Sequence, residues 1–191
     1  MSAHGSRRVD PPPPRMNFLL FLIATATLAH SAPSPSPQPV AFRVGPLRFD
    51  RPESWRWVPP SGSFRAAQLE KKSPDGTPLT LTFSRFSSGE GGSTQANLDR
   101  WTAQFTTSNA PRTEIKKGSE GTLNLFQIEG TLRAGTPGGP KRELPQALLL
   151  GAILESQGEQ VVMKLVGPAQ AVSSAEKDFL RLAYLAIGLT P

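Results

Sequence analysis

The side chains that most often carry catalysis are scarce in this sequence. His4 and His30 are its two histidines, and it contains no cysteine. Both histidines lie in an N-terminal segment that we expect to be removed. The mature chain would then lack a Ser-His-Asp triad, a cysteine nucleophile, a histidine base and the common zinc or copper ligands. Carboxylates, lysines, hydroxyls and the single tyrosine, Tyr184, remain.

The carboxylates do not compensate for this loss. They are scattered, no pair has a spacing typical of acid–base catalysis, and no oxygen-rich calcium loop is present. We therefore predict no catalytic residue, no metal and no cofactor, and we expect a non-enzymatic protein.

Two tryptophans, Trp55 and Trp57, are candidate binding residues. On an extended chain they point to the same face. They can stack on a sugar ring, or they can close one edge of the hydrophobic core, which is the interpretation that we favour.

A second candidate site is the polar stripe of Asn97, Arg100 and Gln104 on a predicted helix. The stripe either anchors the helix to the sheet, which we favour, or forms a binding face. The glycine-rich turn 87–92 before the helix lacks the Lys-Ser/Thr of a phosphate loop, so we expect it only to let the helix dock.

The basic residues indicate a weakly basic surface. The formal net charge is +6, and the segment we expect to be removed carries +2 of it, which leaves +4 on the mature chain. Such a charge does not predict nucleic-acid binding. Three basic doublets lie at predicted turns or strand ends, and they would support transient contact with a membrane surface only if they converged. They are Lys71-Lys72, Lys116-Lys117 and Lys141-Arg142.

The N-terminus has the pattern of an export signal. Arg15 precedes an apolar run from Phe18 to Ala29, which is too short to span a bilayer. We predict a signal peptide over 1–31 with cleavage after Ser31. Cleavage after Ala29 or Ala32 is an alternative, and Met16 is an alternative start. Residues 32–39 form a Pro/Ser-rich tether, and residues 40–191 form a single domain. We expect the mature protein in the periplasm or the medium.

Period-2 alternation predicts several short strands before the stretch 89–105 and more after it. The stretch itself predicts a glycine turn and an amphipathic helix, capped by Ser93 or Thr94 and running to Phe105. A capping box of Ser173 and Glu176 predicts one C-terminal helix, ended by Gly188. The continuous apolar run 147–154 predicts a strand covered on both faces, and 134–145 a long loop. Short turns and two helices indicate an α+β domain with a mainly antiparallel sheet.

Two segments resemble known families. Phe49-x-x-Pro52-x-x-Trp55, together with the order strands-helix-strands-helix, resembles PsbP-like domains. The resemblance implies a layered α+β fold and an accessory, assembly or binding role. The segment Gly91-Gly92-x3-Ala96-Asn97-Leu98-x-Arg100-Trp101-x2-Gln104-Phe105 resembles a segment of exported bacterial proteins with no assigned function.

These observations favour an exported, non-enzymatic accessory or binding protein of the cell envelope with a protein partner. The alternatives are a carboxylate-dependent hydrolase or binder of envelope polysaccharide that uses Trp55 and Trp57, and a protein held at a surface by its basic doublets. The oligomeric state stays open.

Overall fold

The computed structural model describes residues 40–60, 64–87, 89–135 and 142–190. These residues all belong to one compact unit, Pro37–Pro191. The predicted signal peptide and tether lie outside the described residues. The prediction of a mainly antiparallel α+β domain is confirmed.

Two runs of strands are each followed by helices. The first half contains β1 (Ala41–Val44), β2 (Leu47–Asp50), β3 (Arg56–Val58), β4 (Ala67–Lys72), β5 (Pro78–Ser87) and α1 (Thr94–Thr102). The second half contains β6 (Phe105–Ser108), β7 (Arg112–Lys117), β8 (Thr122–Ala134), β9 (Arg142–Ser156), β10 (Glu159–Pro168), α2 (Ala169–Ser173) and α3 (Glu176–Ala186).

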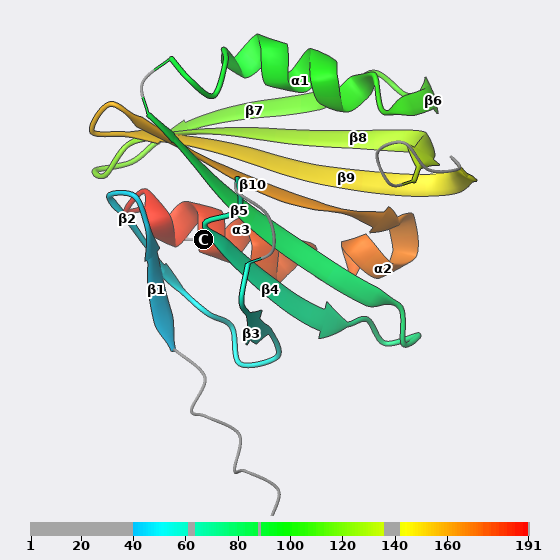
Figure 1. Cartoon of the computed structure of the whole chain (residues 1–191), viewed down its shortest axis with the longest axis horizontal. Helices are drawn as coiled ribbons and strands as arrows, with labels where there is room; N and C mark the ends of the chain where they lie inside the picture. Colours follow the sequence, from blue (N-terminus) through cyan, green and yellow to red (C-terminus); the bar gives the residue numbers. More distant parts are fainter. Residues whose placement is uncertain (1–39, 61–63, 88, 136–141, 191) are drawn as a thin grey trace, which may run out of the picture. The chain divides into compact units, whose positions relative to one another are not determined.

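The strands form a large sheet and a separate hairpin. The sheet has the order β3-β4-β5-β10-β9-β8-β6, and β7 also pairs with β8. All of its pairings are antiparallel, and β1 pairs with β2 on its own. The long strands β8, β9 and β10 make up the middle of the sheet, and in Figure 1 helix α1 lies along β7 and β8 while α2 and α3 lie by the other face.

Strand β9 shows why both faces of the sheet are covered. Leu148, Leu150, Ala152 and Leu154 belong to the cluster that contains α2, α3 and the β1–β2 hairpin. Ala147, Leu149 and Ile153 alternate with them and belong to the cluster beneath α1. The apolar run therefore forms one strand buried on both sides, as its composition predicts. The larger cluster lies on the α2–α3 side, so the sheet is not organised around α1 alone.

Three local predictions are wrong. The C-terminal helical region is two helices, because Ser173 ends α2 and Ala175, which has no side-chain hydrogen bond, caps α3. The capping box of Ser173 and Glu176 therefore does not form. Helix α1 ends at Thr102, and Phe105 begins β6 instead of extending the helix. The expected loop 134–145 is wrong at both ends, because β8 runs to Ala134 and β9 starts at Arg142, and its middle, 136–141, lies outside the described residues.

Candidate functional site

Lys164 is a charged residue in the middle of an apolar strand. In β10, Val161, Met163 and Leu165 point into the α2–α3 core, and Val162 and Val166 contribute to the α1 side. Because side chains alternate along a strand, Lys164 lies on the α1 side between these two valines. Its side chain is half-buried. The signal for it in the sequence is the single charge within Val-Val-Met-Lys-Leu-Val.

Among the described residues, the Lys164 ammonium has one acceptor. Its Nζ donates to Oε1 of Gln104 at 2.7 Å. Within the described part of the chain it forms no ion pair, and burial lowers its pKa from the ordinary value of 10.5 to about 8. An ammonium has three donors. The sheet therefore holds a desolvated cation whose hydrogen-bonding capacity is only partly used, which is a costly arrangement.

The turn at the end of α1 places Gln104 beside Lys164. Ser93, one of the two caps that the sequence predicts, precedes the helix, and its Oγ accepts from the backbone N of Ala96 at 3.1 Å. Trp101 packs edge-on against Phe126 with 5.5 Å between ring centroids. Its indole also covers Gly151, where a Cβ would collide with the ring. The absent side chain at Gly151 lets α1 lie close to the sheet.

Two of the three residues of the predicted stripe have accessible polar groups. Asn97 is 3% exposed, and its Nδ2 donates to the carbonyls of Gly91 at 2.8 Å and Ser93 at 3.1 Å. It therefore anchors the glycine turn. Arg100 is exposed and donates through Nη1 to Oδ1 of Asn97 at 3.1 Å. We call Arg100, Gln104 and Lys164 the α1 flank.

The tryptophan pair does not form a binding surface. Trp55 is 1% exposed, and its Nε1 donates to Oδ2 of Asp178 at 2.8 Å. Trp57 is half-buried and packs against Phe42 at 5.0 Å between centroids. Both residues face the α2–α3 core, so the prediction of a shared face is correct but that face points inward. Trp55 has no accessible ring face for a sugar.

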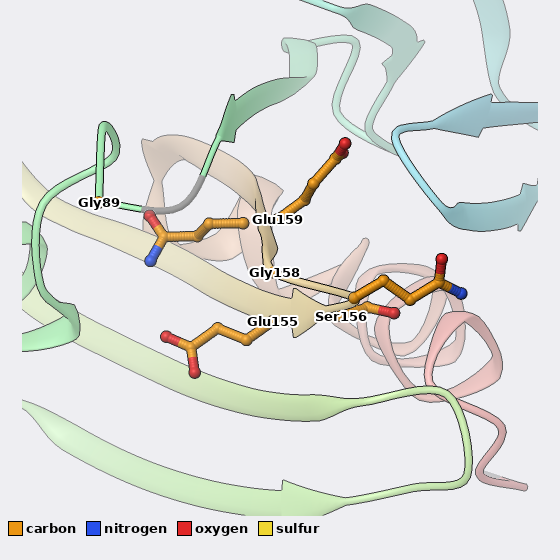
Figure 2. A pocket seen from close by; sticks show the side chains of 7 residues that line it. Gly89, Glu155, Ser156, Gly158 and Glu159 are labelled. Atoms are coloured by element: carbon orange, nitrogen blue, oxygen red, sulfur yellow. The ribbon is translucent and has the colours of Figure 1, made fainter.

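Figure 2 shows a cavity at the tip of the β9–β10 hairpin, lined by Gly89 and residues 155–160. Glu155 and Glu159 extend from it in different directions. Glu159 is engaged by Arg85, whose Nε donates to its Oε2 at 2.7 Å. This cavity therefore offers no converging pair of carboxylates for hydrolysis among the residues that line it.

The basic doublets do not converge either. Lys71-Lys72 lie on β4 and Lys116-Lys117 on β7, toward opposite edges of the sheet. Lys71 and Lys116 also pair with Asp178 and Glu114 respectively. Lys141 lies outside the described residues. The four lysines that the structure describes therefore do not form a single basic patch, and the possibility that the doublets converge is wrong for them.

The described residues contain neither a metal-binding cluster nor a membrane-spanning helix. Across the described ranges, no group of three or more acidic residues is arranged to hold a metal ion. No helix in that part of the chain has the length and apolar character needed to cross a bilayer.

Comparisons with known proteins identify backbone similarity only. No family model matches the chain, and no curated protein matches it in sequence. The chain is similar to the solution structure of cyanobacterial PsbP (CyanoP) from Synechocystis sp. PCC 6803, with a TM-score of 0.46 and 10% identity over 72% of this chain and 83% of the other. It is also similar to a Pseudomonas aeruginosa protein of unknown function, with a TM-score of 0.38 and 12% identity over 79% and 95%. No conclusion about function rests on either similarity.

Proposed function

We propose that the protein is an exported, non-enzymatic accessory protein of the cell envelope that binds a protein partner through the α1 flank. The observation that carries this proposal is the half-buried Lys164, which has Gln104 as its acceptor and no countercharge among the described residues. Burying a cation in this way lowers the stability of the fold. Residues that lower stability without a structural benefit are expected at functional sites.

Two features of the sequence support the export and the non-enzymatic character of the protein. The apolar run from Phe18 to Ala29 has the length of an export signal. Without His4 and His30, the mature chain has neither histidine nor cysteine, which makes most common catalytic mechanisms unavailable.

Site-specific photocrosslinking in the native envelope tests the proposal. A photoreactive residue in place of Asp99, which is exposed on α1 next to Arg100, should give one stoichiometric protein adduct after irradiation. The matched control places the same residue at Lys177, exposed on α3 by the other face of the sheet. The control should not give that adduct, and Arg100→Ala should weaken the adduct from position 99.

Two results contradict the proposal. Identical adducts from positions 99 and 177, or no adduct from position 99, would remove the α1 flank as the partner site. A turnover activity of the purified mature chain that is abolished by substitution of a single carboxylate or lysine would remove the non-enzymatic assignment.

A further inference from the structure

The face of the sheet beside the α1 flank carries a row of polar side chains. Residues directly opposite one another on neighbouring strands share a face. Lys164 of β10 is opposite Thr82 of β5, and Thr82 is opposite Gln68 of β4. The row therefore crosses three strands at about 4.8 Å per strand.

Neighbouring side chains extend this row toward the edge at β3. Gln68 accepts at Oε1 from Arg65 at 2.9 Å and donates through Nε2 to Glu70 at 2.9 Å. Glu70 also accepts from Arg56 at 2.8 Å. We call Arg56, Arg65, Gln68 and Glu70 the polar strip. Its one carboxylate is engaged by Arg56 and Gln68, so it does not neutralise Lys164.

Helix α1 leaves this part of the sheet uncovered. The apolar cluster beneath α1 contains residues of β8, β9 and β10 but none of β3 or β4. In Figure 1 the helix lies along β7 and β8, away from β3 and β4. The side chains of Thr80, Thr82 and Ser84 in β5, which lie on this face, are half-buried and supply hydroxyls between the strip and Lys164.

The charged side chains of the strip and the flank are predominantly positive. Lys164, Arg56, Arg65 and Arg100 are cations, and Glu70 is the one carboxylate in the strip and flank together. The groups that face Lys164 from the packed elements are Gln104 of the turn between α1 and β6 and Thr82 of β5, and Gly151 is its neighbour on β9. None of the three can supply a negative charge.

We infer that an acidic peptide segment of the partner binds across the α1 flank and the polar strip, with one of its carboxylates accepting from Lys164. The inference rests on the proposed function and names the chemistry of the partner. A carboxylate supplies one negative charge and the acceptors that the ammonium lacks.

The closing experiment measures binding of the blocked peptide Ac-Glu-Glu-Glu-Glu-NH2 to the full mature chain at low salt by calorimetry. The probes for comparison are Ac-Gln-Gln-Gln-Gln-NH2 and inorganic phosphate. The test variant is Lys164→Met, which keeps an unbranched side chain in the strand. The control is Lys177→Met, which removes the same charge from the opposite side of the sheet.

We expect the acidic peptide to bind the wild type and Lys177→Met equally and Lys164→Met at least tenfold more weakly. The glutamine peptide should not bind. Equal binding of the acidic peptide to Lys164→Met would overturn the inference, and so would phosphate binding that depends on Lys164 as strongly as peptide binding does. Thermal unfolding of each variant would exclude loss of the fold as the cause.

Peptide binding and photocrosslinking together distinguish a failure of this inference from a failure of the proposed function. If the adduct from position 99 survives in Lys164→Met and the peptide does not distinguish the variants, the partner site stands and its acidic chemistry is wrong. If the peptide binds through Lys164 but no adduct forms in the envelope, the anion site stands and the accessory function is wrong.

Discussion

The indole Nε1 of Trp55 donates to Oδ2 of Asp178 at 2.8 Å, which joins the segment before β3 to the first turn of α3. Lys71 donates to the same oxygen at 3.1 Å and lies 5.2 Å from the centroid of the Trp55 ring. One carboxylate oxygen therefore orders an indole and an ammonium from separate parts of the chain. The position of Asp178 at the helix N-terminus also favours its negative charge.

Asp178→Asn should reduce the free energy of unfolding by roughly 1.5–3 kcal/mol, because the Trp55 and Lys71 bonds lose their charged acceptor. Denaturant unfolding of the mature chain measures this change. Asp99→Asn is the matched control, since Asp99 is exposed and is bonded only within its own helix, by Gln95. Equal stability of Asp178→Asn and the wild type would show that the Trp55–Asp178 contact is not stabilising.

The same contact shows what the sequence can and cannot predict. Local patterns were sufficient for the alternation in β9, the Ser93 cap and the end of α3 at Gly188, which has a positive φ of 77°. Each depends on neighbours within a few residues. The burial of Trp55 depends on Asp178, which is 123 residues away, and period-2 alternation cannot tell an inward face from an outward one.

Only part of the candidate site is predictable from the sequence, because the site also depends on a contact between residues far apart in the chain. The sequence predicts Arg100 and Gln104 on one stripe of a helix, whereas the structure has Arg100 on α1 and Gln104 in the turn after it, where Gln104 accepts from Lys164. Lys164 was missed, because its contact with Gln104 joins residues 60 positions apart and follows from strand order. Asn97 was selected correctly as a polar residue on this stripe, but its side chain is used to hold Gly91 and Ser93.

Gly151→Ala should lower the free energy of unfolding by about 1–3 kcal/mol, since the added methyl group would collide with Trp101 and displace α1. Gly167→Ala is the control in the neighbouring strand, because a Cβ there meets Val172 at an ordinary 3.5 Å. Denaturant unfolding compares the two. If both variants are equally stable, close contact of Trp101 with the sheet does not limit the position of α1.

If the protein is exported, the N-terminus of its mature form should lie at the predicted cleavage site. Mass spectrometry of the protein recovered from its native cells should give a mature chain that begins at Ala32. Ser31→Arg should leave an uncleaved precursor or move the cut to after Ala29 or Ala32, because signal peptidases require small residues at the cleavage site. Ser36→Arg, beyond the cut, is the control and should be processed normally. A full-length chain in the cytoplasm would contradict the export assignment.

The last prediction concerns the pH dependence of stability. The pKa of Lys164 is about 8 in the folded protein against an ordinary 10.5, so between these values the unfolded chain binds more protons than the folded chain. The contribution of Lys164 to the free energy of unfolding should therefore rise with pH across this window. Below pH 8 the folded protein carries the full cost of the buried charge, which at about 1.4 kcal/mol per pH unit is at most roughly 3–4 kcal/mol.

Lys164→Met should consequently be more stable than the wild type at pH 7, and its advantage should shrink as the pH approaches 10.5. Denaturant unfolding of both proteins at a series of pH values measures this difference. The titration of groups that both proteins share contributes equally to each and cancels in the difference. Lys177→Met should show no such trend, because Lys177 is exposed on α3. A difference between Lys164→Met and the wild type that is constant with pH would mean that the Lys164 ammonium is not desolvated by α1. The α1 flank would then lose the feature that marks it as a binding site.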